Sequence, residues 1–369
     1  MSATPSRRSR RARPVVMTVV GARPQFVKAA PLSRALRRQL REVLVHTGQH
    51  YDAEMSDAFF HELGIPAPDR HLGIGGGGHG RMTGRMLEAL EAAMLEERPD
   101  LVLVLGDTNS TLAGALAAAK LQIPVAHLEA GLRSFDRRMP EEINRVVVDH
   151  VSTLLFSPTP EGVRNLAAEG ITRGVHRVGD VMMDAVLAHS GRARRRPLPF
   201  GQRAGAYYLA TLHRQENVDD PARLRSILGA LERLPHPVLL PLHPRTRSRI
   251  ARAKLRPGPN LRLLPPLGYL DMLGLLTRAR AILTDSGGLQ KEAFILGRPC
   301  VTLRDTTEWV ETLRGGANRL VGADPEAIAR AVRAIEARRP RPPARHPYGD
   351  GHAARRIAER IASFLKGRG

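Results

Sequence analysis

The 369-residue sequence contains one cysteine and one tryptophan, and aromatic residues make up 4% of it. A single cysteine excludes a disulfide framework. Cys300 lies in the apolar run from Pro299 to Leu303, so we expect a buried, unreactive thiol rather than a nucleophile. No apolar run approaches the roughly 18 residues of a membrane-spanning helix, and the basic start leads into Pro14 instead of a signal-peptide core. We therefore predict a cytoplasmic protein in which residues 1–13 form a disordered arm.

Lysine is also scarce, because five lysines stand beside 52 arginines in a chain with a net charge of +21. Such a charge suggests a nucleic-acid-binding protein. The arginines, however, are spread along the whole chain, and no base-stacking motif or zinc-finger spacing accompanies them. We expect most of them at the solvated surface, with no nucleic-acid and no membrane partner. The positive field favours an anionic small ligand such as a nucleotide.

Apolar runs that are typical of strands alternate with helical patterns along the chain, which predicts parallel sheets covered by helices. The sequence 191–205, rich in proline, glycine and arginine, interrupts the alternation. We predict an α/β protein of two doubly wound Rossmann-like domains that face each other across a cleft. The predicted parts are residues 14–190, a linker at 191–205, residues 206–351, and a final helix in 352–369 that packs back on the first domain. A (β/α)₈ barrel also alternates, but the interruption and the ten or more expected strands argue against it.

Three carboxylates stand close to expected strand ends in this basic chain. Asp107 follows the apolar run 101–105, Glu129 follows 124–128, and Glu141 lies in the next loop. Because ligands of doubly wound sheets bind at the carboxyl ends of the strands, we interpret these acids as candidates for acid/base chemistry beside a bound anion.

Two turns are candidates for binding phosphate. Ser286, Gly287 and Gly288 follow an expected strand and begin a helix, whose free N–H groups and dipole favour an anion. An ordinary helix capped by Ser286 is the alternative. Arg23 and Lys28 occupy a similar turn in the first domain, where both cations are able to reach a sugar phosphate, although a solvated arginine is equally compatible with the pattern.

Two histidines end expected strands of the second domain. His213 is able to titrate near neutrality or to donate to a phosphate, and His243 resembles it with weaker support. A hydrogen-bonded core histidine is the alternative for both. The pair His46 and His50 lies at a predicted strand end rather than on a helix, so it gives no support for zinc.

The glycine-rich segment 73–80 matches a dinucleotide-binding pattern in form only, because no strand-like run precedes it. Nicotinamide binding is therefore not supported. A flexible loop that closes over the substrate fits the segment better.

Several of these motifs occur together, in order, over about residues 15–325, and the chain in this respect resembles the non-hydrolysing UDP-N-acetylglucosamine 2-epimerases. The motifs are Gly21-Ala-Arg-Pro24, Thr47-Gly-Gln-His50, Gly106-Asp-Thr108, His127-Leu-Glu-Ala-Gly-Leu-Arg133, Pro140-Glu-Glu-Ile-Asn-Arg145, Thr284-Asp-Ser-Gly-Gly-Leu-Gln290 and Arg304-Asp-Thr-Thr-Glu308. The resemblance implies a two-domain glycosyltransferase-B fold, no metal and no nicotinamide cofactor, a UDP-sugar substrate and a homodimer. It also implies that the C2 proton of the sugar is removed while UDP leaves C1, that 2-acetamidoglucal forms, and that UDP adds back with protonation from the other face.

The resemblance also assigns site residues. It implies that Asp107, Glu129 and Glu141 are the catalytic acids and that His213 is the catalytic histidine. It places substrate and diphosphate contacts on a further set of residues: Arg23, Lys28, Arg145, His243, Ser286, Gly287, Gly288, Glu292, Arg304 and Glu308.

Departures from the common family pattern leave the substrate open. Gln25 stands where many members have glutamate, Glu308-Trp-Val-Glu311 replaces Glu-Arg-Pro-Glu, and the segment 73–80 lacks the side chains with which many members bind an activating UDP-sugar. These features resemble the archaeal enzymes and the UDP-2,3-diacetamido-2,3-dideoxy-glucuronate 2-epimerases. That epimerase activity, a hydrolysing 2-epimerase and a glycosyltransferase are the alternative enzymes, and a nucleic-acid-binding protein is the alternative that is not an enzyme.

Overall fold

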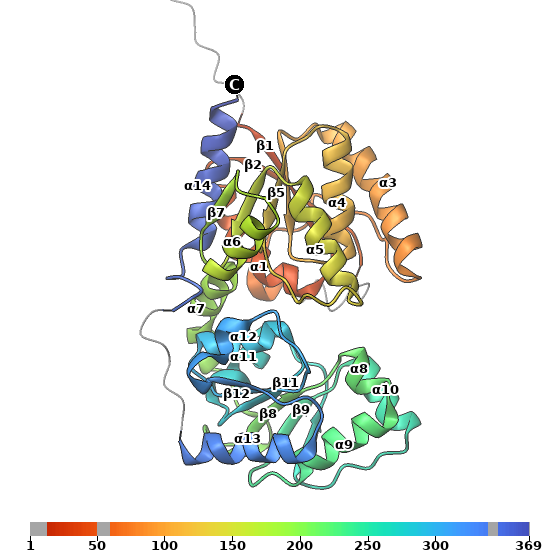
Figure 1. Cartoon of the computed structure of the whole chain (residues 1–369), viewed down its shortest axis with the longest axis vertical. Coiled ribbons are helices and arrows are strands. Elements are labelled where there is room, and N and C mark those ends of the chain that lie inside the picture. The colour runs from red at the N-terminus through yellow and green to blue at the C-terminus, as the bar shows by residue number, and fades with distance from the viewer. Residues whose placement is uncertain (1–12, 50–59, 339–345, 369) are drawn as a thin grey trace, which may run out of the picture.

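The computed structural model describes residues 13–49, 60–338 and 346–368 (Figure 1). Two parallel sheets form the molecule. The first contains, in spatial order, β3 (Arg70–His71), β2 (Arg41–His46), β1 (Val15–Val20), β4 (Leu101–Leu105), β5 (Val125–Leu128), β6 (Leu154–Ser157) and β7 (Val175–Arg177). The second contains β10 (Leu261–Leu264), β9 (Val238–Pro241), β8 (Tyr208–Thr211), β11 (Ile282–Thr284), β12 (Cys300–Thr302) and β13 (Asn318–Leu320). The predicted fold class is confirmed, and the barrel is excluded.

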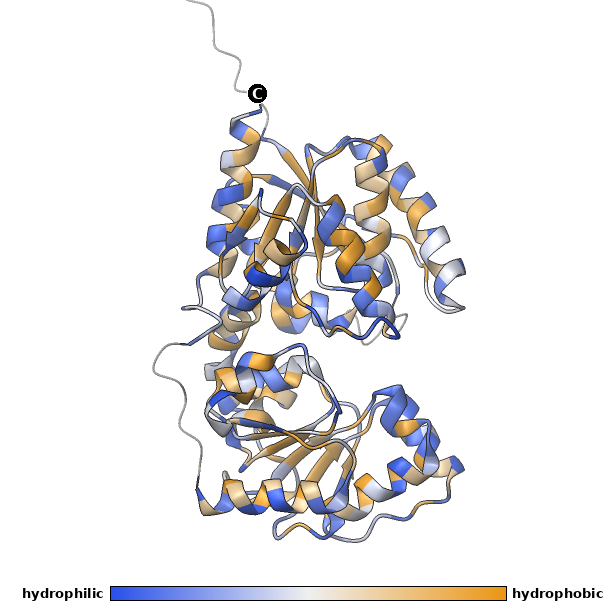
Figure 2. Ribbon diagram, viewed as in Figure 1, coloured by the Kyte–Doolittle hydropathy of each residue, from blue (hydrophilic) through white to orange (hydrophobic). Residues whose placement is uncertain are grey.

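Helices cover both faces of the first sheet, and therefore its strands are apolar on both sides. In β1, Val16 and Val20 belong to one buried cluster, whereas Met17 and Val19 belong to another on the opposite face. The covering helices are α1 (Arg23–Leu36), α7 (Val181–Arg194) and α14 (Ala353–Lys366) on one face, and α3 (His79–Glu97), α4 (Asn109–Lys120) and α5 (Pro140–Val151) on the other, with α6 (Pro160–Ala168) beside β7. Figure 2 shows the apolar strands enclosed between these layers.

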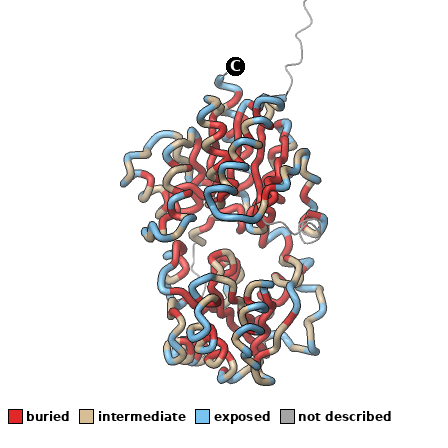
Figure 3. Tube along the Cα trace, turned by 90° about the vertical axis from the view of Figure 1, so that its right-hand side faces the viewer, coloured by how far each residue is buried: buried red, intermediate tan, exposed pale blue. Residues whose placement is uncertain are grey.

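The second sheet is covered in the same way. The remaining elements are η1 (Pro199–Gly201), α8 (Gln215–Val218), α9 (Pro221–Glu232), α10 (Pro244–Arg252), α11 (Tyr269–Arg278), α12 (Gly287–Ile295), η2 (Val310–Gly316) and α13 (Pro325–Ala337). Figure 1 shows α11 and α12 on the side of this sheet that faces the first domain. The buried residues follow the strands of both sheets (Figure 3), so each sheet has a core of its own.

The sequence 191–205, predicted as a linker, begins inside a helix. α7 continues to Arg194, Ala193 is fully buried, and α7 packs against α11. Arginine is a good helix former, and positive side chains in a last turn interact favourably with the helix dipole, so the basic run extends α7 instead of ending it. The division of the chain at residue 206 stays a prediction.

The final helix, α14, packs against α1 and α7 of the first domain. Its buried residues Ile357, Ile361 and Leu365 recur at helical spacing and join the cluster that contains Phe26 and Leu36. The chain thus returns to its first domain after completing the second.

Two short strands, β3 and β13, were not expected from the sequence, because Arg70–His71 and Asn318–Leu320 lack an apolar run. The predicted arm lies outside the described residues up to residue 12, and so does His50. Within the described part of the chain, no helix combines the length and the apolar character that crossing a membrane requires.

Candidate active site

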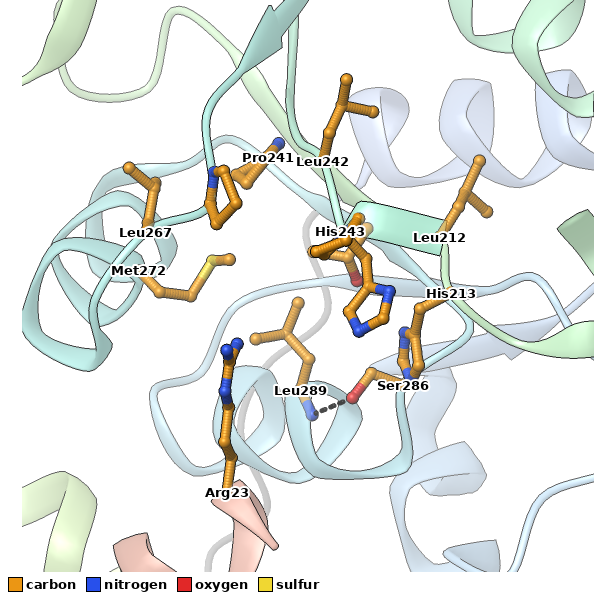
Figure 4. A pocket seen from close by; sticks show the side chains of 13 residues that line it. Arg23, Leu212, His213, Pro241, Leu242, His243, Leu267, Met272, Ser286 and Leu289 are labelled. Atoms are coloured by element: carbon orange, nitrogen blue, oxygen red, sulfur yellow. Dashed lines mark hydrogen bonds between the residues drawn. The ribbon is translucent and has the colours of Figure 1, made fainter. Parts of the chain in front are cut away.

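A pocket lies between the loops of the second sheet and the start of α1 (Figure 4). Its volume is about 180 Å³, and it is lined by Arg23 from the first domain and by His213, His243, Ser286 and Leu289 among residues of the second. His213 follows β8, and Ser286 follows β11, so the pocket lies at the carboxyl ends of neighbouring parallel strands. This is the usual place for a ligand in a doubly wound sheet.

His213 is held in this pocket by a buried carboxylate. Its Nδ1 lies 3.0 Å from Oδ1 of Asp285, and its backbone N–H donates to both oxygens of the same group. Asp285 also accepts hydrogen bonds from the backbone N–H of Arg214 and from Asn217. Burial raises the pKa of the Asp285 carboxyl, but the charge of His213 and these hydrogen bonds outweigh that effect and leave the pKa below its usual value. An ionised Asp285 fixes the orientation of the half-exposed His213 ring.

The N-terminus of α12 forms another wall of the pocket. Ser286 is the N-cap, and its Oγ accepts from the backbone N–H of Leu289 at 3.4 Å. A Cβ added to Gly287 would lie 2.5 Å from Oε1 of Glu308, whereas a Cβ on Gly288 would meet only Ser286 Oγ at 3.8 Å. The structure therefore requires glycine at 287 for packing, while Gly288 leaves space beside free N–H groups, as an anion site needs.

Asp107 lies beyond β4 and is paired with Arg145 of α5. The Arg145 Nη2 and Nε atoms lie 2.6 and 3.0 Å from Asp107 Oδ2, and Nη1 lies 2.7 Å from Glu142. Glu142 in turn accepts from the backbone N–H groups of Ser134 and Phe135. Burial lowers the pKa of Arg145, but the charges of Asp107 and Glu308 outweigh burial and leave the pKa above its usual value. The guanidinium therefore stays charged. The Nε and Nη2 atoms of Arg145 thus orient Asp107, and Nη1 holds Glu142, which in turn fixes the loop at Ser134 and Phe135.

Glu129 follows β5 in a strained backbone conformation, with a φ of 72° that residues other than glycine rarely adopt. Its carboxylate is buried, and each oxygen faces an ammonium group: Oε2 pairs with Lys28, and Oε1 lies 2.7 Å from Nζ of Lys291. Burial raises the pKa of Glu129, but the charges and hydrogen bonds of the two lysines outweigh it and bring the pKa to about 2. Such strain beside a buried charge is common at functional sites.

His127 lies on β5, two residues before Glu129. Its Nδ1 is 2.7 Å from Oδ1 of Asp149, and its Nε2 is 2.8 Å from the carbonyl oxygen of Gly106. Both partners are acceptors, and these two contacts connect the end of β4 to the end of β5. Arg133 completes this buried network through Asp149.

Three further predicted residues are buried in the second domain. Arg304 donates to Glu308 at 2.8 Å, and burial raises the pKa of Glu308 while Arg304, Arg145 and Arg214 lower it to about 2. Glu292, buried on α12, has the opposite balance. Burial raises its pKa to about 7, against the smaller influence of Tyr269 and Lys291.

Two predicted elements have few contacts. Glu141 lies near the start of α5, half-buried, and has no ion pair or hydrogen bond to another side chain among the described residues. The segment 73–80, predicted to be a loop, ends within α3, which begins at His79. Gly73, Gly75 and Gly76 line a separate cavity with Gln49.

The structure therefore gathers most of the predicted residues into two groups. Arg23, His213, His243 and Ser286 line the pocket, and the other group contains Asp107 with Arg145 and Glu129 with Lys28. Among the described residues, no hydrogen bond or ion pair links Glu141 to either group. Sequence reasoning missed the supporting side chains, which are Gln25, Glu142, Asp180, Asp285 and Lys291. A signal existed for Lys291, because lysine is so rare in this chain. Cys300 is buried and its pKa is raised to about 12, as an unreactive thiol requires.

A model of the UDP-N-acetylglucosamine 2-epimerase family matches residues 34–362. The chain belongs to that family. Among curated proteins it is 52% identical to UDP-2,3-diacetamido-2,3-dideoxy-D-glucuronate 2-epimerase of Pseudomonas aeruginosa, over 95% of this chain and 99% of the relative. It is 43% identical to UDP-N-acetylglucosamine 2-epimerase of Methanocaldococcus jannaschii, over 94% and 98% of the two chains.

Solved structures of the 2-epimerase family are similar to this chain along nearly its whole length. The crystal structure of the M. jannaschii enzyme in complex with UDP-GlcNAc and UDP has a TM-score of 0.87 and 42% identity, covering 95% of this chain and 99% of that one. The Neisseria meningitidis enzyme bound to UDP-GlcNAc has a TM-score of 0.86 and 31% identity, covering 95% and 100%. The family resemblance inferred from the motifs is confirmed, and with it the isomerase class.

Proposed function

We propose that this protein is a non-hydrolysing UDP-N-acetylglucosamine 2-epimerase that interconverts UDP-GlcNAc and UDP-ManNAc. The observation that carries the proposal is the arrangement of two facing groups, in which acids at the ends of β4 and β5 oppose a helix N-terminus and a histidine at the ends of β11 and β8. One group suits proton transfer at a sugar ring, and the other suits a diphosphate.

The C2–H bond of the sugar is not acidic, so its cleavage needs departure of UDP from C1 in the same process. Arg23, His213 and the N-terminus of α12 line one pocket. We assign diphosphate binding to them, because they would stabilise the charge that develops on leaving UDP. His213, oriented by Asp285, is able to donate a hydrogen bond to the departing oxygen.

Inversion at C2 requires proton-transfer groups on both faces of the ring. We assign this work to the set Asp107, Glu129 and Glu141. Asp107 and Glu129 are held in fixed orientations by cations, which keeps their oxygens directed. Glu141 is the acid of the three with no cationic partner among the described residues.

Deuterium exchange tests the proposal. Purified enzyme is incubated with UDP-GlcNAc in deuterated water, and C2 is followed by NMR and mass spectrometry. We expect deuterium at C2 of both epimers and a stable amount of total UDP-sugar. Absence of exchange with every UDP-HexNAc donor would refute the epimerase, and steady accumulation of UDP with free sugar would show a hydrolysing enzyme instead.

A second candidate substrate is UDP-2,3-diacetamido-2,3-dideoxy-glucuronate, favoured by the 52% identity to an epimerase of that name. The chemistry at C2 is the same, and the additional carboxylate of this sugar suits an arginine-rich protein. Parallel kinetics with each donor decide between the two, because the true substrate will have the higher kcat/KM.

We also propose that the enzyme is a cytoplasmic homodimer that supplies a UDP-sugar for cell-wall or polysaccharide synthesis. The family resemblance and the nucleotide-sugar chemistry support this role. Light scattering on the purified protein should give twice the chain mass, and a mass of 40.4 kDa would refute the dimer.

A further inference from the structure

Lys291 joins the two domains at the centre of the candidate site. It lies on α12 of the second domain, four residues and about one helical turn beyond Gly287. Its Nζ is 2.7 Å from Oε1 of Glu129 and 2.7 Å from Oδ2 of Asp180, both in the first domain. The lysine side chain is 1% exposed. It thus connects the helix that begins the expected diphosphate site to a candidate catalytic acid.

The surroundings of Lys291 exclude water. Its ammonium group lies 3.9 Å from the ring centre of Trp309. In the same buried cluster, the Tyr348 ring packs against Trp309, and the Phe294 ring packs against Tyr348. In such a low-dielectric setting, charges interact more strongly than they do in water, and a cation over an aromatic face is favourable. The Lys291 contacts are therefore of the kind that fix a side chain in one position.

The charges around Glu129 balance. Lys28 on α1 and Lys291 on α12 supply two positive charges, and Glu129 and Asp180, the N-cap of α7, supply two negative ones. Among the described residues, removing Lys291 would leave Glu129 with one cationic partner and Asp180 with none, and the ion pairs between the second domain and these two acids would be lost.

We propose that Lys291 is a positioning residue that holds the Glu129 carboxylate in an orientation set by the second domain. Glu129 is then correctly directed when α12, and any diphosphate bound at its N-terminus, lies in its docked position against the first domain. Lys291 acts through Glu129 and needs no contact with substrate. This inference deepens the proposed epimerase function and rests on it.

The test uses two variants of the full-length protein. Lys291→Met keeps the length of the side chain without its charge, and Lys291→Met/Asp180→Asn also removes the unpaired buried aspartate, so that folding is retained. Lys120→Met, at an exposed position at the end of α4, is the matched control. For the double variant we expect kcat to fall by about 10- to 100-fold, as misplacement of a reacting group does, while KM changes by less than about threefold and the acidic limb of the pH profile moves to higher pH.

A purely structural role predicts a different result. Activity would then fall only in proportion to the folded fraction, the pH profile would stay unchanged, and the proposal would be overturned. Wild-type kcat in the double variant would overturn it as well.

A measurement without turnover separates this inference from the proposed function. Carboxyl ¹³C NMR of glutamate-labelled protein, with the Glu129 signal assigned by its loss in Glu129→Gln, should show Glu129 ionised at pH 4 in the wild type and titrating at higher pH in the double variant. An unchanged titration would refute the link between Lys291 and Glu129 even in an active enzyme. If the wild type exchanged no donor at C2, the epimerase proposal would fail, while this titration would still decide the link.

Discussion

The guanidinium of Arg145 lies 2.6 Å from the carboxylate of Asp107, and a single carboxylate atom, Oδ2, accepts both hydrogen bonds between these two side chains. Among the described residues, Oδ1 accepts no hydrogen bond, and the Asp107 side chain is 33% exposed. A carboxylate held in this way has one atom fixed for orientation and one available for a proton.

Replacement of Asp107 by asparagine should abolish most of the turnover and keep the fold. Asparagine preserves the shape but cannot accept a proton, so we expect kcat to fall by about 10²- to 10⁴-fold. Asp350→Asn is a matched control, since Asp350 also lies 2.6 Å from an arginine, Arg356, but on the surface of the first domain. Deuterium incorporation at C2 gives the rates, and circular dichroism checks the fold. Near wild-type exchange by Asp107→Asn would remove this residue from the mechanism.

His213→Asn should reduce turnover by about 100-fold or more, because the ring that faces the pocket loses its proton donor. His61→Asn, at an exposed position away from the pocket, should leave turnover unchanged.

Asp285→Asn should lower both activity and stability, since this buried carboxylate accepts hydrogen bonds from the backbone of two residues as well as holding the His213 ring. Steady-state rates and urea unfolding measure the two effects. Equal activity of His213→Asn and wild type would exclude a catalytic role.

Glu308 makes stability depend on pH in a direction that can be stated. Its pKa of about 2 lies below the ordinary value near 4.3, so its ionised form stabilises the fold. That stabilisation is complete above the unfolded pKa and is lost as the pH falls toward 2. Glu308→Gln should cost about 3 kcal/mol at pH 7, and the difference from wild type should shrink between pH 5 and 3. Urea unfolding at several pH values measures this, with the exposed Glu88→Gln as control. A difference that is constant with pH would contradict the expectation.

The neighbouring glycines at the start of α12 should respond differently to alanine. Gly287→Ala places a Cβ 2.5 Å from Glu308 Oε1, so we expect lower stability even without ligand, by about 1–3 kcal/mol. Gly288→Ala meets no close atom, so its stability should be close to that of wild type, but its methyl group should obstruct a bound diphosphate and weaken UDP binding by about tenfold or more. Thermal unfolding with and without UDP separates the two effects. Tight UDP binding by Gly288→Ala would move the diphosphate away from this turn.

The sequence predicted the sheets well because their long strands are buried on both faces and therefore read as continuous apolar runs. It failed where a pattern was short or ambiguous, as in β3, where two polar residues complete a sheet edge, and in α7, where an arginine run extends a helix. The site residues that follow strands were visible in advance. The rarity of lysine marked Lys291, but its partners could not be predicted. Glu129 and Asp180 lie 162 and 111 residues away from Lys291 in the chain, and the three side chains meet only when the domains dock.

Gln25 shows the same limit on a smaller scale. As a departure from the family pattern it had no explanation, but its amide nitrogen donates to the carbonyl oxygen of Leu105 at 2.7 Å while its oxygen accepts from the backbone N–H of Gly21. An ionised glutamate is unable to make the first of these contacts. Gln25 thus links the ends of β1 and β4 by hydrogen bonds. This role becomes visible only when the structure shows that these two strands are neighbours.

The packing of α14 on the first domain affects how the protein folds during its synthesis. Because α14 completes the cover of the first sheet beside α1, that sheet keeps an uncovered apolar strip until residues 353–366 have been synthesised and have left the ribosome. The second sheet, by contrast, has all its strands and helices within one continuous stretch, from β8 to α13. We therefore expect the second domain, although it is synthesised later, to finish folding first. A chain whose synthesis stalls before Ala353 would expose the uncovered apolar surface of the first sheet, and we expect chaperones to bind it.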